Sequence, residues 1–254
     1  YHKILIKEPE SELRKVYEKL KEKLKVHVDQ KEEILNTTLC WALASYWNEA
    51  FGIMPILELI GVSGSGKTRF GTALTFIAKK GLGIADPTDA NLARVIDSYR
   101  PTVLIDDWDL VQRAQKRIAH SILKHVYKNG ILIPRLTQYG KRFYVEMFSP
   151  YAPVILTTCE PITEPQLQRR IIEIRCEKSQ RQFPPIPELN AYFLSYFEEE
   201  RKTLYELMFL LLPKVHELNQ SLRTDLPSPH AEVWQPVLVI AKLLGEDIFE
   251  SVYE

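Results

Sequence analysis

The sequence has few cysteines, no long apolar run and no internal repeat, and these shortages exclude several classes of protein. The densest apolar run ends after six residues at Pro213, far short of the roughly 18 residues that a membrane span needs. The three cysteines form no CxxC pair, which excludes a disulfide framework and a structural zinc site and indicates a reducing, cytoplasmic setting. The chain starts at Tyr1 without a signal-like segment, which is typical of a piece trimmed from a longer protein. We therefore expect a soluble protein with no membrane partner.

Neither sign of charge is in excess, because 33 Lys and Arg balance 33 Asp and Glu. This balance excludes a polycation that binds nucleic acid over its whole surface. The charges are segregated, however: residues 110–145 hold eight basic residues and no acidic one, whereas residues 188–254 hold twelve acidic and five basic residues. A contact with nucleic acid would therefore be local. At 45% hydrophobic and 26% charged, the 254 residues have a globular composition, enough for one large domain or a core with a smaller companion.

Short apolar runs alternate with helical patterns through the middle of the chain. This alternation predicts an α/β fold with a mostly parallel sheet covered by helices on both faces. Two strand-like runs, 131–136 and 142–148, flank a turn at 137–141 and predict an inserted β-hairpin. The strands expected in the sheet are 56–60, 82–85, 102–106, 154–158 and 171–176, and the helices between them are 67–79, 88–98, 111–128 and 163–169.

The two ends of the chain are predicted to be helical. Amphipathic patterns at 10–25 and 37–51 precede the first strand, and a Pro-rich stretch at 183–187 precedes helices that break at Pro213 and again at 227–229. We divide the chain into an N-terminal helical segment, 1–54, a P-loop core, 55–182, and a C-terminal helical lid, 183–254.

Residues 61–68 read GVSGSGKT, which fits the phosphate-binding pattern G-x4-G-K-[ST] between a strand and a helix. In this phosphate loop the glycines let backbone N–H groups wrap a triphosphate, and the following helix adds its positive N-terminal dipole. Lys67 would place its charge on the β- and γ-phosphates, and the Thr68 hydroxyl would bind Mg²⁺. The predicted nucleotide-binding residues are Gly61, Val62, Ser63, Gly64, Ser65, Gly66, Lys67 and Thr68.

An apolar strand that ends in acid follows some tens of residues later, at 102–107. Asp106 is the predicted Mg²⁺ ligand, through water, and Asp107 the predicted base that activates the attacking water. Asp109 is the alternative base.

Polar side chains at the end of the next strand and just before the last one complete the predicted site. Thr157 and Thr158 would orient the water or contact the γ-phosphate, although threonine is also simply common in strands. Arg169 and Arg170 would stabilise transition-state charge at the nucleotide of a neighbouring subunit, with Arg170 favoured.

Several stretches of the chain, spread over residues 37–245, resemble AAA+ ATPases. They are most similar to the uncharacterised helicase-like ATPase domains found near primases in prokaryotic phages, plasmids and archaeal mobile elements. The stretches are the helix around Trp41, SGSGKTR at 63–69, RPTVLIDD at 100–107, IPR at 133–135 and EVWQPVLVIA at 232–241.

This resemblance implies an ATP-driven, hexamer-like homo-oligomeric ring that acts on DNA, with nucleotide between subunits and the lid over the site. The chain departs from the family pattern at Asp107, where Glu is usual, and at Thr157 and Thr158, where Asn is commoner. It also lacks a clear lid arginine, for which Arg223 or His230 would substitute.

Clustered positive charge and an aromatic ring are what binding to a DNA strand requires. The hairpin supplies both through Arg135, Tyr139, Lys141 and Arg142, and by resemblance it projects into the pore of the ring. On the preceding helix, Lys116, His120, Lys124 and Lys128 share one stripe. The alternative is that this basic helix contacts the acidic C-terminal tail of its own or a neighbouring subunit.

The function expected from the sequence is that of an ATPase that uses ATP and Mg²⁺ as a DNA helicase or translocase in mobile-element replication. Two alternatives remain: a nucleotide-gated loader or assembly switch with a protein partner, and a small-molecule kinase. A GTPase is disfavoured because the sequence has no N/TKxD segment to recognise guanine.

Overall fold

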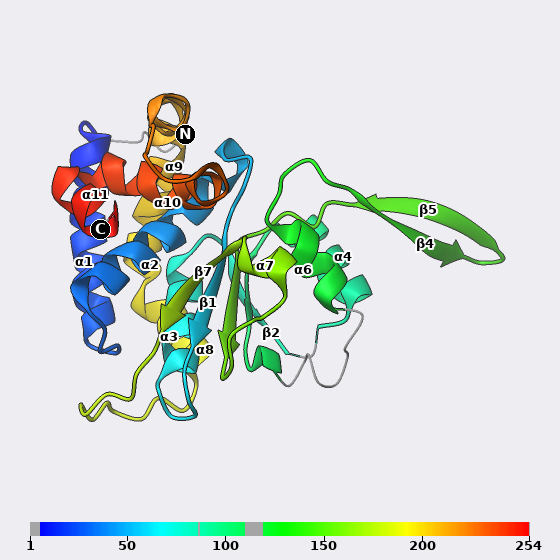
Figure 1. Cartoon of the computed structure of the whole chain (residues 1–254), viewed down its shortest axis with the longest axis horizontal. Coiled ribbons are helices and arrows are strands. Elements are labelled where there is room, and N and C mark those ends of the chain that lie inside the picture. Colours follow the sequence, from blue (N-terminus) through cyan, green and yellow to red (C-terminus); the bar gives the residue numbers. More distant parts are fainter. Residues whose placement is uncertain (1–5, 86, 110–118, 254) are drawn as a thin grey trace.

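A five-stranded parallel sheet forms the centre of the molecule (Figure 1), in a computed structural model that describes residues 6–85, 87–109 and 119–253. The sheet confirms the predicted α/β class. Every residue of its third and fourth strands along the chain is buried, as expected of parallel strands covered on both faces. Its order is β2-β3-β6-β1-β7, with β1 at Ile56–Ile60, β2 at Gly81–Ile84, β3 at Thr102–Ile105, β6 at Val154–Thr158 and β7 at Ile171–Arg175.

Two apolar clusters sandwich this sheet because successive strand residues face opposite sides. Leu57 and Leu59 pack toward α3 (Lys67–Ile77), whereas Ile56 belongs to the cluster on the other face. That second face is covered by α4 (Asp89–Tyr99), α6 (Ala119–Val126) and the short α7 (Pro165–Gln168).

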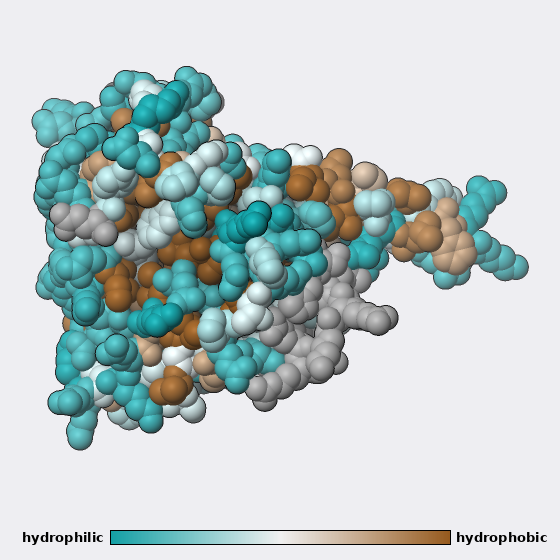
Figure 2. Space-filling view, in the orientation of Figure 1, coloured by the Kyte–Doolittle hydropathy of each residue, from teal (hydrophilic) through white to brown (hydrophobic). Residues whose placement is uncertain are grey.

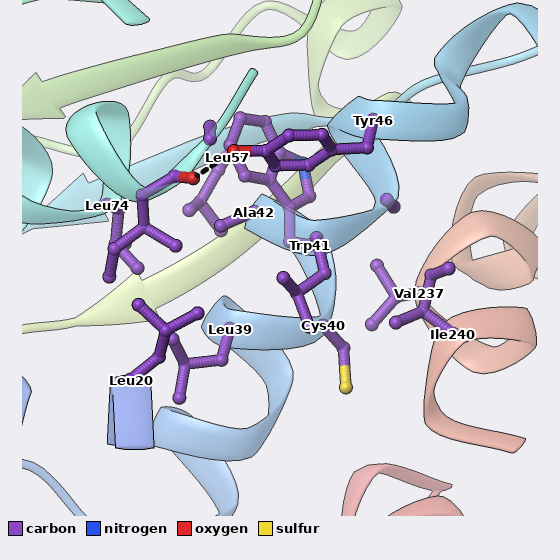
Figure 3. Packing of buried hydrophobic residues seen from close by; sticks show 14 of the residues in the cluster. Leu20, Leu39, Cys40, Trp41, Ala42, Tyr46, Leu57, Leu74, Val237 and Ile240 are labelled. Atoms are coloured by element: carbon purple, nitrogen blue, oxygen red, sulfur yellow. Dashed lines mark hydrogen bonds between the residues drawn. The ribbon is translucent and has the colours of Figure 1, made fainter. Parts of the chain in front are cut away.

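Helices from both ends of the chain pack together on the α3 side of the sheet (left in Figure 1). Figure 3 shows Leu20, Trp41 and Val237 from three of these helices in one cluster. The Trp41 Nε1 donates to the carbonyl of Pro55 at 2.8 Å, which joins this helical layer to the start of β1. The helices are α1 (Pro9–Lys25), α2 (Glu32–Ala44), the 3-10 helix η1 (Ser45–Ala50), α8 (Leu189–Tyr196), α9 (Glu198–Ser221), α10 (Ser228–Leu244) and α11 (Glu246–Tyr253).

Two helix predictions need correction. The helix before the core begins at Glu32 rather than at 37, and its first turn already contributes Leu35 to the core, four residues before the buried Leu39. The predicted break at Pro213 is wrong, since α9 runs through it. Leu211 and Val215 are buried on either side of the exposed proline, so packing of the helix outweighs the lost hydrogen bond.

The predicted hairpin is present and extends well beyond the body of the molecule (right in Figure 1). It pairs β4 (Ile133–Tyr139) with β5 (Arg142–Phe148) in antiparallel register. The turn is shorter than the expected 137–141, because the β-formers Thr137 and Tyr139 continue the strand and leave Gly140 and Lys141 as a two-residue turn. Gly140 has a φ of +62°, which such a tight turn requires.

Within the described ranges, no helix is long and apolar enough to cross a bilayer.

Candidate nucleotide site

The phosphate loop has the backbone that its glycines predict. Gly64 and Gly66 take φ of +79° and +82°, and a Cβ on Gly61 would lie 2.4 Å from the carbonyl oxygen of Cys176. Nothing lies within 4 Å of a Cβ built on Gly66, so this part of the loop borders open space. The loop therefore leaves room for a ligand at the first turn of α3, where backbone N–H groups favour an anion.

Lys67 opens α3 and is buried, and its Nζ lies 3.4 Å from the Sγ of Cys159. Because a thiol is a weak hydrogen-bond acceptor, the ammonium can exchange this contact for a phosphate oxygen at small cost. Cys159 follows β6 directly and is exposed. No motif marks a cysteine at that strand end, so the sequence alone does not predict this contact.

The predicted metal ligands meet at the carboxyl end of the sheet. The Oδ1 of Asp106 accepts from the Thr68 hydroxyl at 3.1 Å and from the Thr157 hydroxyl at 2.5 Å. The Thr157 oxygen accepts in turn from the backbone N–H of Asp107 at 2.8 Å. These bonds tie α3, β3 and β6 together, so Thr157 fixes the positions of both acids.

Asp107 and Asp109 differ in what their side chains contact. Asp107 is exposed, has a φ of +48° and borders a cavity of about 680 Å³ together with Thr68 and Asp106. The Oδ2 of Asp109 accepts from the backbone N–H of Cys159 at 2.5 Å. Asp107 is therefore the acid that faces the space beside the loop, whereas Asp109 holds the turn after β6.

Thr158 lies on the opposite side of β6 from Thr157, because neighbouring strand residues face opposite sides. It is buried, and its hydroxyl donates to the Oε1 of Glu58 at 2.9 Å. The backbone N–H of Ile162 donates to the same oxygen at 3.1 Å. The structure thus places Thr157 beside the two acids, and it places Thr158 in a contact that holds the loop after β6.

Glu58 belongs to no recognised motif, although a single carboxylate inside the apolar strand ILELI is a visible signal in the sequence. Its side chain is 1% exposed, and burial raises its pKa above the ordinary value of 4.5 despite the two donors. Because the pKa of Glu58 is higher in the folded than in the unfolded state, Glu58 contributes stability to the fold below pH 4.5. That stability is lost as the pH rises through the folded-state pKa.

We therefore expect Glu58→Gln to gain stability relative to the unmodified protein as pH rises. Glutamine keeps an oxygen that can accept from Thr158 and Ile162 but carries no charge to desolvate. The measurement is the free energy of unfolding in urea from pH 4.5 to 8, with the exposed Glu206→Gln as control. Parallel pH curves for Glu58→Gln and the unmodified protein would contradict this account of Glu58.

The two arginines before β7 have different surroundings. The guanidinium of Arg170 donates to the carbonyl of Lys124 and lies 4.1 Å from the ring centroid of Tyr127, so it is engaged within its own chain. Arg169 is exposed. Of the two possible lid residues, Arg223 lies just after α9 and donates to the carbonyls of Gln220 and Leu222 at the end of that helix. His230 is exposed in the first turn of α10.

The hairpin brings the four predicted DNA contacts together. Register pairs Arg135 with Glu146 and Tyr139 with Arg142, so these side chains share one face, and Lys141 is at the tip. Tyr139 donates to Glu146 at 3.0 Å. The opposite face pairs Pro134 with Met147 and Leu136 with Val145, and all four are exposed. Figure 2 shows apolar residues along this projecting hairpin.

Part of the predicted basic stripe lies outside the described residues, since Lys116 falls within 110–118. Side-chain contacts of His120 also lie outside the described set. Of the remaining two, Lys128 is exposed, and the Nζ of Lys124 forms an ion pair with Glu164 at 2.6 Å.

The phosphate loop joins β1 to α3, and two acids follow the end of β3. In the sheet, β6 lies between β1 and β3. These features define an α/β P-loop NTPase fold. No protein-family model matches the sequence, and no curated protein matches it.

Solved structures align with most of the chain at low identity. A structure of JCV helicase with a bound acetamide compound is 15% identical over 97% of this chain and 72% of that chain, with a TM-score of 0.35. The apo NrS-1 C-terminal region is 12% identical over 93% of this chain and 69% of that one, with a TM-score of 0.45. A structure of JCV helicase with a bound inhibitor is 17% identical over 87% and 71% of the two chains, with a TM-score of 0.34. The fold assignment rests on the strand order and the loop.

Proposed function

We propose that this chain is an ATPase of AAA+ type that hydrolyses ATP with Mg²⁺. The observation that carries the proposal is the hydrogen-bonded cluster of Thr68, Asp106, Thr157 and Asp107 beside the phosphate loop. A loop with only a structural role would not need a buried lysine, two hydroxyls and two acids beside its glycines. A triphosphate and its metal need each of them.

The oxygen donors at this site fit magnesium. Mg²⁺ keeps several waters and binds through one or two carboxylates together with phosphate oxygens. Asp106 and Thr68 supply a carboxylate and a hydroxyl whose oxygens lie 3.1 Å apart. Within the described ranges no group of three or more His, Cys, Asp and Glu could hold a metal by itself, which agrees with a metal that arrives with the nucleotide. When bound, the ion neutralises charge on the phosphates.

Each residue has a distinct part in the proposed reaction. Backbone N–H groups of the loop and Lys67 hold the β- and γ-phosphates. Asp107 accepts a proton from water as the water oxygen bonds to the γ-phosphorus and the bond to the β–γ bridging oxygen breaks. Thr157 orients Asp107 through its backbone, so its role is one of positioning.

The work that we assign to this ATPase is movement on DNA within a hexamer-like ring, as a helicase or translocase in mobile-element replication. The charged face of the hairpin supports DNA contact, because Arg135 and Arg142 lie on it and Lys141 lies at its tip. In such a ring, Arg169 or Arg170 would reach the nucleotide of the next subunit. Arg169 is already exposed, whereas Arg170 would first have to leave Tyr127.

Removing the basic tip is expected to weaken DNA binding and to abolish stimulation of the ATPase by DNA. The change is Lys141→Ala together with Arg142→Ala. If both contact phosphates, the slope of log affinity against log salt should fall by about 2, one for each contact. The measurement is fluorescence anisotropy of labelled single- and double-stranded DNA between 50 and 200 mM salt, a range over which such contacts change affinity strongly.

The matched control for the hairpin variant is Lys15→Ala together with Lys19→Ala, which removes two exposed charges from α1. An unchanged DNA affinity and salt slope in the hairpin variant would refute DNA contact at this surface.

A second candidate is a nucleotide-gated loader or assembly switch. The apolar face of the hairpin favours it, because Leu136 and Val145 are 70% and 63% exposed, which suits a protein partner better than a phosphate backbone. Slow hydrolysis that a protein partner stimulates and DNA does not would support this alternative.

A further inference from the structure

A connecting segment, residues 177–188, joins β7 to α8. Several of its residues border a cavity of about 310 Å³ around His27, together with residues 64–66 of the phosphate loop. The end of the segment and the first residues of α8, 187–191, border the other cavity, the one beside the two acids. The position of the connecting segment therefore shapes the space that Asp107 faces.

The start of the connecting segment is tied to the N-terminal helices. The Ser179 hydroxyl donates at 2.5 Å to the Oδ2 of Asp29, which lies between α1 and α2. The Arg181 guanidinium lies 3.9 Å from the Oδ1 of the same carboxylate. These contacts hold the first residues of the segment without involving α3.

Arg69 joins the middle of the connecting segment to the first turn of α3. Its Nη2 donates to the Pro184 carbonyl at 3.0 Å, and its guanidinium carbon lies 5.6 Å from the Phe183 ring centroid. The guanidinium thus combines a charge-assisted hydrogen bond with a cation–π contact. Arg69 directly follows Thr68, whose hydroxyl donates to Asp106. One turn of helix therefore carries both a predicted metal ligand and the contact with the segment.

The residues that follow this contact are stiff. Positions 183–187 read FPPIP, and each proline holds its φ at about −65°, so the chain between Pro184 and Pro187 has little freedom. Further along, Phe193 of α8 is fully buried, and α8 packs against α3. Residues 187–191 therefore lie between two fixed points, Pro184 and Phe193. Loss of the Arg69 side chain would free the first of these points and leave the second.

We propose that Arg69 is a positioning residue that, through Pro184, sets residues 187–191 at the edge of the cavity that Asp107 faces. The inference rests on the proposed function, because that cavity is the site of the proposed hydrolysis. A nucleotide on the loop orders the first turn of α3, and Arg69 in that turn then orders residues 187–191. Turnover should therefore depend on Arg69 more strongly than nucleotide affinity does.

The test compares Arg69→Ala and Arg69→Lys with the unmodified chain by amide hydrogen exchange at residues 186 and 188–191, which have an N–H. AMP-PNP, an ATP analogue that resists hydrolysis, is expected to slow this exchange in the unmodified chain, and Arg69→Ala should lose that slowing. In Arg69→Ala, kcat for ATP should fall about tenfold, because small misplacements at a reacting centre are costly, while AMP-PNP affinity stays within about threefold. Arg69→Lys should restore most of the slowing and of kcat, since its ammonium can donate to the Pro184 carbonyl.

The matched control is Arg181→Ala, which removes the other guanidinium beside the Phe183 ring, 5.1 Å from its centroid, but keeps the bond to Pro184. Its kcat should equal that of the unmodified chain. Equal loss of kcat in Arg181→Ala and Arg69→Ala, or full kcat in Arg69→Ala, would overturn the positioning role. An AMP-PNP affinity that falls as far as kcat would also overturn it. Arg69 would then bind the nucleotide directly, through the buried Nη1 that has no hydrogen-bond partner in the described residues.

The exchange measurement separates failure of this inference from failure of the proposed function. If hydrolysis is normal and Arg69→Ala leaves exchange at 186–191 unchanged, this inference alone fails. If the unmodified chain neither binds AMP-PNP nor hydrolyses ATP, the proposed function fails. The hold of Arg69 on the segment is then refuted if Arg69→Ala exchanges residues 186–191 no faster without nucleotide. Should Arg69→Ala not fold, Arg69→Met, which keeps the length of the side chain and loses its charge, is measured in the same way.

Discussion

Lys67→Ala is expected to abolish ATP turnover and to weaken nucleotide binding. The Lys67 ammonium is buried at the start of α3. Its hydrogen bond goes to the Sγ of Cys159, which is a weak acceptor. The ammonium is therefore poised to neutralise the β- and γ-phosphates, whose charge the loop amides cannot balance alone. Loss of one such group in a dry site lowers turnover by at least about a hundredfold.

The measurement for Lys67→Ala is phosphate release from ATP with Mg²⁺, together with AMP-PNP binding. Lys202→Ala, an exposed lysine of α9, is the control for general loss of charge. Turnover in Lys67→Ala within a few-fold of the control would show that loop 61–68 is not a catalytic phosphate site.

Asp107→Asn is expected to separate binding from hydrolysis. Asparagine has nearly the same shape and, like aspartate, tolerates the φ of +48° at this position, so the turn should persist. The variant keeps the contact between the backbone N–H and Thr157 but loses the base. Because a positioned base contributes about 10²–10⁴-fold, turnover should fall by that factor while AMP-PNP affinity stays the same.

Asp109→Asn is the matched control for the base, because Asp109 lies two residues away in the same turn. Its carboxylate holds the backbone N–H of Cys159 rather than facing the cavity. We expect Asp109→Asn to reduce turnover much less than Asp107→Asn does. The opposite order would assign the base to Asp109.

Much of the fold could be predicted because it depends on local patterns. Continuous apolar runs such as 102–105 indicate strands buried on both faces, and β3 is buried throughout. The loop at 61–68 is specified by glycines at positions whose φ is positive, and the hairpin by two alternating strands around Gly140. The pairing of Asp106 with Thr68 also follows, since both lie at the carboxyl edge of a parallel sheet.

The contacts that sequence could not predict are all non-local. Thr157 and Thr158 are adjacent, and only the pleat of β6 decides that Thr157 meets Asp106 while Thr158 meets Glu58. The contact of Lys67 with Cys159 and the cavity around His27 join segments far apart in the chain. Pro213 was predicted to break a helix because proline removes a backbone hydrogen bond. The packing of Leu211 and Val215 outweighs that loss, and α9 continues through the proline.

The most direct test of the central claim is the rate of ATP hydrolysis by the purified chain with and without single-stranded and double-stranded DNA, with its mass measured in ATP. The account predicts Mg²⁺-dependent hydrolysis that DNA stimulates, in an assembly of several copies. A chain that binds ATP and hydrolyses it as a monomer, at a rate that DNA leaves unchanged, would contradict the proposed DNA motor. A chain that neither binds nor hydrolyses ATP would contradict the nucleotide site itself.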